Sequence, residues 1–147
     1  MTITGVRIEA QRELIATRDD VWELLSEPHH LSDWWPEYTT IRPDRRGLAE
    51  GARWQVARGG SPGFLRRPGG EGLIVVTAVE PPLRLAWHDL EQRFDAEIRL
   101  ELAHDGHTRA ILTLDASPWR VVAEGLRPTP RQALARLHAL CQTAAEL

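Results

Sequence analysis

The segment 29–38 has the sequence HHLSDWWPEY and gathers two histidines, one aspartate, two tryptophans and the only tyrosine of the chain. Imidazole and carboxylate groups transfer protons and bind metal ions. His29 and Asp33 have the i, i+4 spacing of two ligands on one helix face, but a third ligand is missing nearby. The adjacent His29 and His30 would point to different sides of a helix. We therefore predict no metal at this segment.

Charged side chains in the buried phase of predicted strands are the second group of candidates. Arg12 lies in the first strand, Arg58 in the third, and Asp89 at the end of the fifth. Because a buried charge needs a partner, one interpretation is an Arg12–Asp89 ion pair that stitches the sheet. In the other, Arg12 holds a carbonyl or carboxylate of a bound molecule, and Asp89 or His88 moves its protons. Tyr38 is a further candidate proton donor.

Local patterns place these residues on a strand and two short helices. The segment 6–16 alternates apolar and polar residues, which predicts a half-buried strand. Thr17 and Asp20 have capping-box spacing ahead of an apolar stripe and predict a short helix over 17–25. A second short helix is predicted over 28–35, because a proline suits its first turn and another proline follows its end.

Six more predicted strands follow, separated by Gly, Pro and Asp-Gly sequences. In 94–102 apolar and charged residues alternate strictly, so one sheet face is dry and the other is wet. The same alternation after the Asp105-Gly106 turn indicates an antiparallel partner. The Gly- and Pro-rich segment 59–70 predicts a loop. The predicted strands cover 38–42, 52–58, 72–80, 83–89, 93–103 and 108–116.

The C-terminal segment 129–147 predicts a long helix that covers the dry face of the sheet. Thr129 and Gln132 form a second capping box, Pro130 suits the first helical position, and an apolar stripe follows. The preceding segment 117–128 has a capped start and a glycine stop. It predicts either a separate short helix or a kinked extension of the long helix.

Size and composition limit the class of protein. A chain of 147 residues, 42% hydrophobic and 27% charged, is expected to form one domain over 1–147. The net charge of -3 and the scattered arginines argue against nucleic-acid binding. Because no apolar run approaches the roughly 20 residues that cross a bilayer, and no secretory-signal pattern begins the sequence, we expect no membrane insertion and a cytoplasmic location. A single cysteine, Cys141, excludes an internal disulfide.

Three stretches carry a resemblance to a known superfamily. The first, 12–37, has the sequence RELIATRDDVWELLSEPHHLSDWWPE, in which an Arg-x-apolar-x-Ala strand end leads to a Val-Trp helix and a tryptophan followed by proline. The others are PLRLAWHD over 82–89 and GHTRAILTL over 106–114. With the order of predicted elements, they resemble the START/SRPBCC superfamily. The similarity spans nearly the whole chain and points to two branches, polyketide cyclase/dehydrase proteins and activators of a heat-shock ATPase.

The resemblance implies an α+β helix-grip fold: a curved antiparallel seven-stranded sheet wrapped around a long C-terminal helix, with two short helices after the first strand. It also implies a cavity between sheet and helix that holds an apolar small molecule, aromatic, polyketide or acyl, in a carrier or sensor without a cofactor. Small inward residues such as Ala96 and Ala110 would leave room there. Alternatively, Trp54, Trp87 and Phe94 fill the space.

Adjacent tryptophans are expected to take different positions around this cavity. If 28–35 is helical, Trp34 and Trp35 diverge by about 100° around the axis, so only one faces the interior fully. We expect Trp35 to line the entrance of the cavity. The candidate ligand-binding residues are Trp35, Trp54, Trp87, Phe94, Ile98, Leu112, Leu134, Leu137 and Cys141.

Two other functions remain open. In an enzyme of the polyketide cyclase/aromatase type, Arg12 or Tyr38 would stabilise an enolate, and Asp89 or His88 would take the proton. A regulatory domain would instead bind a protein partner through its outer face. A dry apolar cavity favours the carrier, convergent polar groups favour the enzyme, and a filled interior favours the partner domain. The sequence leaves the oligomeric state open.

Overall fold

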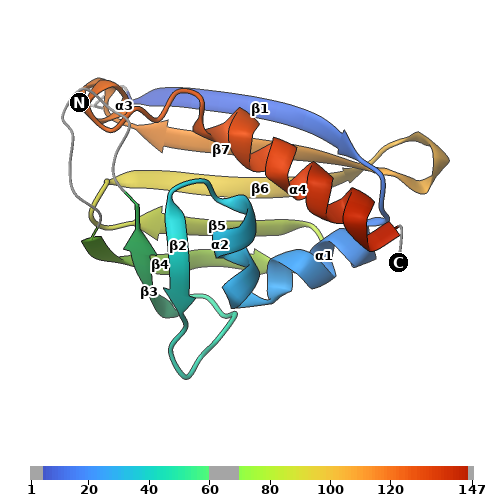
Figure 1. The fold of residues 1–147 in the computed structure, drawn as a ribbon, viewed down its shortest axis with the longest axis horizontal. Helices are drawn as coiled ribbons and strands as arrows, with labels where there is room; N and C mark the ends of the chain where they lie inside the picture. Colours follow the sequence, from blue (N-terminus) through green and yellow to red (C-terminus); the bar gives the residue numbers. More distant parts are fainter. Residues whose placement is uncertain (1–4, 60–69, 146–147) are drawn as a thin grey trace.

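The computed structural model describes residues 5–59 and 70–145, and one antiparallel sheet dominates it (Figure 1). Its seven strands have the order β1-β7-β6-β5-β4-β3-β2, so that β1 and β2 form the two edges. The strands are β1 (Val6–Leu14), β2 (Tyr38–Arg42), β3 (Arg53–Arg58), β4 (Gly70–Glu80), β5 (Arg84–Asp89), β6 (Phe94–Leu102) and β7 (Thr108–Ala116).

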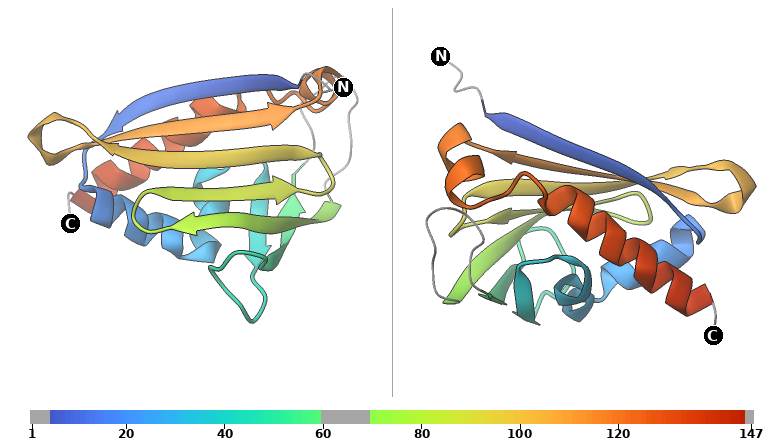
Figure 2. Two further views of the ribbon diagram at one scale, coloured as in Figure 1. Left: turned by 180° about the vertical axis from the view of Figure 1, so that it is seen from behind. Right: turned by 45° about the horizontal axis from the view of Figure 1, so that its top comes forward.

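Helices lie on one side of this sheet. The long helix α4 runs across it, and the view from behind in Figure 2 shows the opposite face without a covering helix. This arrangement is the helix-grip fold of the α+β class, as predicted. The helices are α1 (Arg18–Ser26), α2 (Leu31–Trp34), α3 (Pro118–Ala123) and α4 (Thr129–Ala145), with 3-10 turns η1 (Pro28–His30) and η2 (His104–Gly106).

The core follows from the strand alternation. In β6, Phe94, Ala96, Ile98 and Leu100 are buried, whereas Asp95 and Arg99 are exposed on the other face. The antiparallel register of β6 with β7 continues this pattern, so Ile98 lies opposite Leu112, which is also buried. Each such apolar side chain contributes about 1.5–3 kcal/mol on burial. The dry face therefore holds α4 against the sheet.

The first helix begins as predicted. The side chain of Thr17 accepts a hydrogen bond from the backbone N–H of Asp20 at 3.2 Å, which caps α1. The segment 117–128, whose structure the sequence left open, contains the separate helix α3. Its own cap is Ser117, whose hydroxyl accepts from the N–H of Arg120.

The second short helix is shorter than predicted. Instead of one helix over 28–35, the chain forms η1 and then the four-residue helix α2. Trp35 has left the helical region, with φ −85° and ψ 119°, because Pro36 disfavours helical geometry in the residue before it. This change determines where the two tryptophans point.

Most of the predicted Gly- and Pro-rich loop, residues 60–69, lies outside the described residues. Among the helices that the structure describes, none is both long enough and apolar enough to span a bilayer.

Candidate functional site

A buried tyrosine–carboxylate pair lies at one end of the sheet. Asp89, the last residue of β5, is fully buried, and its Oδ2 accepts a hydrogen bond of 2.7 Å from the Tyr38 hydroxyl. Its Oδ1 accepts from the backbone N–H groups of Glu91 at 3.0 Å and Gln92 at 2.8 Å. These three donors satisfy the carboxylate and also hold the β5–β6 turn. The pair joins β2 to β5 through two residues that are 51 positions apart in the sequence.

Tyr38 is held in its protonated form. Burial raises the pKa of the Tyr38 hydroxyl well above its ordinary value, and the charge of Asp89 and the hydrogen bond to it act in the same direction. The indole N–H of Trp87 and the charge of Arg58 oppose this rise, although the Trp87 N–H falls short of hydrogen-bond geometry. At neutral pH the site therefore offers a neutral phenol that donates a hydrogen bond to Asp89.

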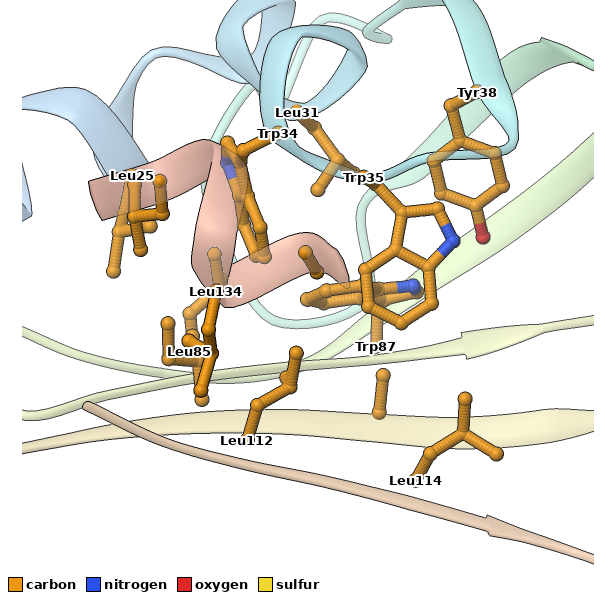
Figure 3. Close-up of a cluster of buried hydrophobic side chains, with 14 of the residues drawn as sticks. Leu25, Leu31, Trp34, Trp35, Tyr38, Leu85, Trp87, Leu112, Leu114 and Leu134 are labelled. Carbon is orange, nitrogen blue, oxygen red and sulfur yellow. The ribbon is translucent and has the colours of Figure 1, made fainter. Parts of the chain in front are cut away.

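Aromatic rings pack directly beside this pair, and Trp35 is at their centre (Figure 3). Its ring is stacked on Phe94 at 5.6 Å between centroids, meets Trp87 edge-on at 5.1 Å, and lies 5.9 Å from the ring of Tyr38. Trp34 contacts Trp35 and Trp87 edge-on at 6.1 and 5.9 Å. We call Trp34, Trp35, Tyr38, Trp87 and Phe94 the aromatic cluster.

Two indole N–H groups of the aromatic cluster are buried without a partner. Nε1 of Trp35 and Nε1 of Trp87 make no hydrogen bond within the described ranges. In Figure 3 both nitrogens point toward the side on which the Tyr38 hydroxyl lies. The indole of Trp54 behaves differently, because its Nε1 donates to the carbonyl of Gly47 at 2.8 Å. A buried donor without an acceptor costs about 1–3 kcal/mol, so this end of the core carries unused hydrogen-bonding capacity.

Further polar side chains are buried around the pair. Arg58 lies opposite Tyr38 in the β2–β3 register and forms an ion pair of 2.5 Å with Glu91, while its Nε has no partner in the described part of the chain. The Gln92 side chain donates a hydrogen bond of 3.2 Å to Glu124, which is also buried. The Oε1 atom of Gln92 is buried without a described partner. Donors and acceptors thus converge on one end of an otherwise apolar core.

Comparison with known proteins identifies the family. Residues 5–142 match the model of the family described as polyketide cyclase/dehydrase and lipid transport. The chain belongs to this family. This description names one of the two branches that the sequence suggested, polyketide cyclase/dehydrase proteins, and it implies hydrophobic ligands. A search of curated proteins found no match.

Solved structures share the fold of this family member at low sequence identity. A protein from Nitrosomonas europaea is 19% identical, with a TM-score of 0.74 and 97% of each chain covered. A Mycobacterium smegmatis protein is 20% identical, with a TM-score of 0.71 and coverage of 97% of this chain and 95% of that one. An AHSA1-like protein from Aeromonas hydrophila is 18% identical, with a TM-score of 0.70 and coverage of 95% and 94%. At these identities the likeness shows the fold alone.

The predicted Arg12–Asp89 pair is wrong. In the sheet β7 and β6 separate β1 from β5, which puts Arg12 and Asp89 about 14 Å apart across the strands, and the register adds about 20 Å along them. Arg12 is exposed on the edge strand, where its charge reaches His138 of α4 and, after burial, lowers the pKa of that imidazole. Arg58 is the arginine that lies beside Tyr38.

His88 is also separate from the pair. Because side chains alternate along β5, His88 faces the opposite side of the sheet from Asp89, where its Nδ1 lies 3.0 Å from Asp95. Of the four predicted catalytic residues, the structure therefore brings together Tyr38 and Asp89 and leaves Arg12 and His88 elsewhere.

The predicted positions of Trp34 and Trp35 also change. Both indoles are buried, because Trp35 follows the end of α2 and the divergence of about 100° between helical neighbours does not apply. Trp35 is part of the core in this structure and not at the rim of an open cavity.

The candidate ligand-binding residues fill the space that they were expected to line. All nine are at most 2% exposed and belong to one hydrophobic cluster, which includes Ile98, Leu112, Leu134, Leu137 and Cys141 in addition to the aromatic residues. The space between these described side chains is packed, as in the alternative in which Trp54, Trp87 and Phe94 fill it. Burial raises the pKa of the Cys141 thiol to about 11, which keeps it protonated at neutral pH.

Sequence reasoning missed part of the polar surroundings. It placed Arg58 in the buried phase but gave it no role in the site, and it did not consider Gln92 or Glu124. An aspartate at a strand end before a short turn is a signal for capping of the next backbone N–H groups, and this signal leads to Gln92. Nothing local marks Glu124 as buried. Within the described residues, no group of three His, Cys, Asp or Glu side chains is arranged to hold a metal ion.

Proposed function

We propose that this chain binds an apolar, ring-containing small molecule with an accepting oxygen at the aromatic cluster, and acts as a carrier or sensor. The observation that carries the proposal is the pair of buried, unpartnered N–H groups of Trp35 and Trp87 beside the Tyr38–Asp89 pair. The rings provide stacking surfaces, and the two N–H groups select a carbonyl, ether or hydroxyl oxygen. The family description supports a hydrophobic ligand.

Energetics explain how a packed interior serves binding. The closed form leaves two donors unsatisfied at a cost of about 1–3 kcal/mol each, and a ligand oxygen between them removes part of this cost. The ligand-bound open form therefore makes hydrogen bonds that the closed form, which is packed without water, does not make. A free-energy difference of this size shifts the protein from the closed form, which dominates without ligand, toward the open form.

Helix α2 is the wall that we expect to move. It has only four residues, carries Trp34 and ends beside Trp35. A helix of this length has little stability of its own and depends on packing against β2 and α4. Displacing it opens the aromatic cluster without breaking the hydrogen bonds of the sheet.

A matched pair of probes tests the proposal by isothermal titration calorimetry. The probes are 2-acetonaphthone, which has an accepting carbonyl, and 2-ethylnaphthalene, which has the same ring without one. We expect the ketone to bind on the order of tenfold more tightly, the equivalent of one net hydrogen bond of about 1.4 kcal/mol. Trp35→Phe and Trp87→Phe should each reduce this preference.

The control is Trp54→Phe, because the Trp54 N–H already donates to Gly47 and is unavailable to a ligand. It should keep the wild-type preference for the ketone. Equal affinities for the two probes in the wild type, or the same loss in all three variants, would overturn the proposed site.

A cofactor-independent cyclase is the second candidate, because Tyr38 and Asp89 converge where the enzyme hypothesis needs a proton donor and a carboxylate. Asp89→Asn preserves the shape of the side chain and its acceptor for the turn. A cyclase would lose turnover of a linear aromatic polyketide substrate in this variant and keep binding. A carrier would bind such a molecule unchanged, with no product from the wild type.

The filled interior favours a third candidate, a domain that docks on a protein partner through its outer face. In that case neither naphthalene probe binds the wild-type chain at all. Native mass spectrometry of the chain purified from its own host gives an independent answer. A co-purifying small molecule supports the carrier, and a co-purifying polypeptide alone supports the partner domain.

A further inference from the structure

The edge strand β1 is open along its full length. It lies at the end of the sheet and pairs on one side only, with β7. Among the hydrogen bonds of residues 5–59 and 70–145, none reaches the backbone on its outer edge. With nine residues and neither proline nor glycine, β1 is longer than the five-residue strand β2 at the other edge. Such an edge is a template for another strand.

A groove follows this open edge. It has a volume of about 290 Å³ and lies between Ile8–Gln11 of β1 and a second wall, which Arg127 before α4 and Pro130 and Arg131 in its first turn form. A strand that added to β1 would cover the groove. The half-buried side chains of Val6, Ile8 and Ala10, which face this side, would then lose their remaining exposure.

The charges on β1 are complementary to those of a second, antiparallel β1. Its exposed face carries Arg7, Glu9, Gln11 and Glu13. When two copies pair about Ala10, Arg7 lies opposite Glu13 of the second copy, and Glu9 lies opposite Gln11. The pairs form twice because the arrangement is two-fold symmetric.

The neighbouring registers are less favourable. Pairing centred on Glu9 puts that carboxylate against its own copy, and pairing centred on Gln11 puts Glu9 against Glu13. Like charges directly opposite each other destabilise a strand pair. Pairing centred on Ile8 puts Arg7 opposite Glu9 but joins only residues 6–10, whereas pairing centred on Ala10 joins all nine residues of β1. Charge and paired length together therefore favour the register centred on Ala10. The small Ala10 side chain also lets the strands approach at the symmetry axis.

The charged groups are accessible for this pairing. The Arg7 side chain is 68% exposed although it already binds Asp115, and that of Glu13 is 39% exposed although it accepts from His107. Each carboxylate oxygen has more than one lone pair, so Glu13 can bind Arg7 of a second copy without losing His107.

From the open edge, the groove and the register that charge and paired length favour, we infer that β1 pairs with β1 of a second copy of this chain, antiparallel and centred on Ala10. The product is a two-fold dimer with one continuous fourteen-stranded sheet, twice the seven strands of one chain. The partner is this chain itself, and the interface is separate from the aromatic cluster.

Charge reversal tests the register by sedimentation velocity. The wild type should be a dimer, whereas Arg7→Glu and Glu13→Arg should each be monomers, because each variant faces like charges in its own homodimer. An equimolar mixture of the two variants should form a heterodimer, since every facing pair then has opposite charges. Arg99→Glu, an exposed charge on β6, is the control and should leave the dimer intact.

A cysteine scan tests the symmetry axis. Ala10→Cys in a Cys141→Ala background should form an intermolecular disulfide on mild oxidation, because residue 10 faces its own copy. Ile8→Cys should not, because residue 8 faces residue 12. A monomeric wild type would overturn the inference, as would single charge reversals that remain dimeric or a mixture that fails to associate.

Discussion

Asp89 shows how one side chain serves the turn and the site together. Its Oδ1 caps the N–H groups that follow β5, and its Oδ2 binds the only tyrosine of the chain. The first role is structural and keeps the carboxylate buried. The second acts in the same direction as burial, which raises the pKa of the Tyr38 hydroxyl and keeps it neutral. Removal of the whole carboxylate by Asp89→Ala would leave three donors without an acceptor, so Asp89→Asn is the informative variant.

The titration of Tyr38 gives a prediction at the residue scale. A raised pKa in the folded state stabilises the fold below the ordinary tyrosine pKa of about 10, and this stabilisation is lost as the pH rises above 10. Because the chain has no lysine and one tyrosine, few other groups titrate there. We expect wild-type stability, measured by urea unfolding, to fall above pH 10.

Two variants separate the contributions to this alkaline loss. Tyr38→Phe should flatten the dependence above pH 10 and should lower stability at pH 7 by about 1–3 kcal/mol, because Asp89 loses a donor. The thiol of Cys141, with its pKa of about 11, contributes stability that is lost between about pH 9 and 11, and Cys141→Ala should remove that part. A Tyr38→Phe profile identical to the wild type above pH 10 would contradict the buried, protonated tyrosine.

At the element scale, the short helices between β1 and β2 determine how the aromatic cluster closes. Pro36 ends α2 early and turns Trp35 into the core, so both tryptophans pack inside. The side chains of Thr17 and Ser117 cap the first turns of α1 and α3. The helical elements near the candidate site are therefore specified by single residues at their ends.

The cap of α1 gives the prediction at this scale. Thr17→Ala removes the acceptor for the Asp20 N–H, so we expect a loss of about 1 kcal/mol in the free energy of unfolding. Thr17→Ser retains the hydroxyl and should restore most of this stability. Chemical denaturation of the two variants measures the difference, and an equal loss in both would assign the effect to the methyl group.

At the scale of the whole molecule, the sheet and α4 form one packed body. Helix α2 is the part with the least stability of its own. The interior strands β6 and β7 pair along nine residues, whereas α2 has four residues. Local opening follows such differences in packing and hydrogen bonding. The ligand entry through α2 that we propose would therefore leave the rest of the fold intact.

Hydrogen exchange tests this hierarchy. We expect the amides of 31–35 to exchange at least roughly tenfold faster than those of β6 and β7. Addition of 2-acetonaphthone should slow exchange at 31–35 and leave β6 and β7 unchanged. Exchange at 31–35 as slow as in these interior strands would contradict an opening wall.

Strands, helices and faces could be predicted from the sequence because their signals are local. The alternation in 94–102 and its return after Asp105-Gly106 specify which side chains face the core, since the side-chain period of a strand is two. The cap at Thr17 and the long helix from Thr129 are local in the same way. These signals placed Asp89 and Tyr38 in the right elements and eight of the nine apolar candidates in the interior, whereas Trp35 was expected at the cavity entrance.

The partners of these residues depended on the tertiary structure. Strand order separates Arg12 from Asp89 and brings Tyr38, 51 residues away, to the carboxylate instead. The end of α2 at Trp34 lets both indoles enter the core, where the sequence left open whether a cavity or packed side chains would lie. The direction of a side chain follows from its neighbours in the sequence. Which residues touch each other, and whether the interior is filled, follow from the arrangement of all elements around one core.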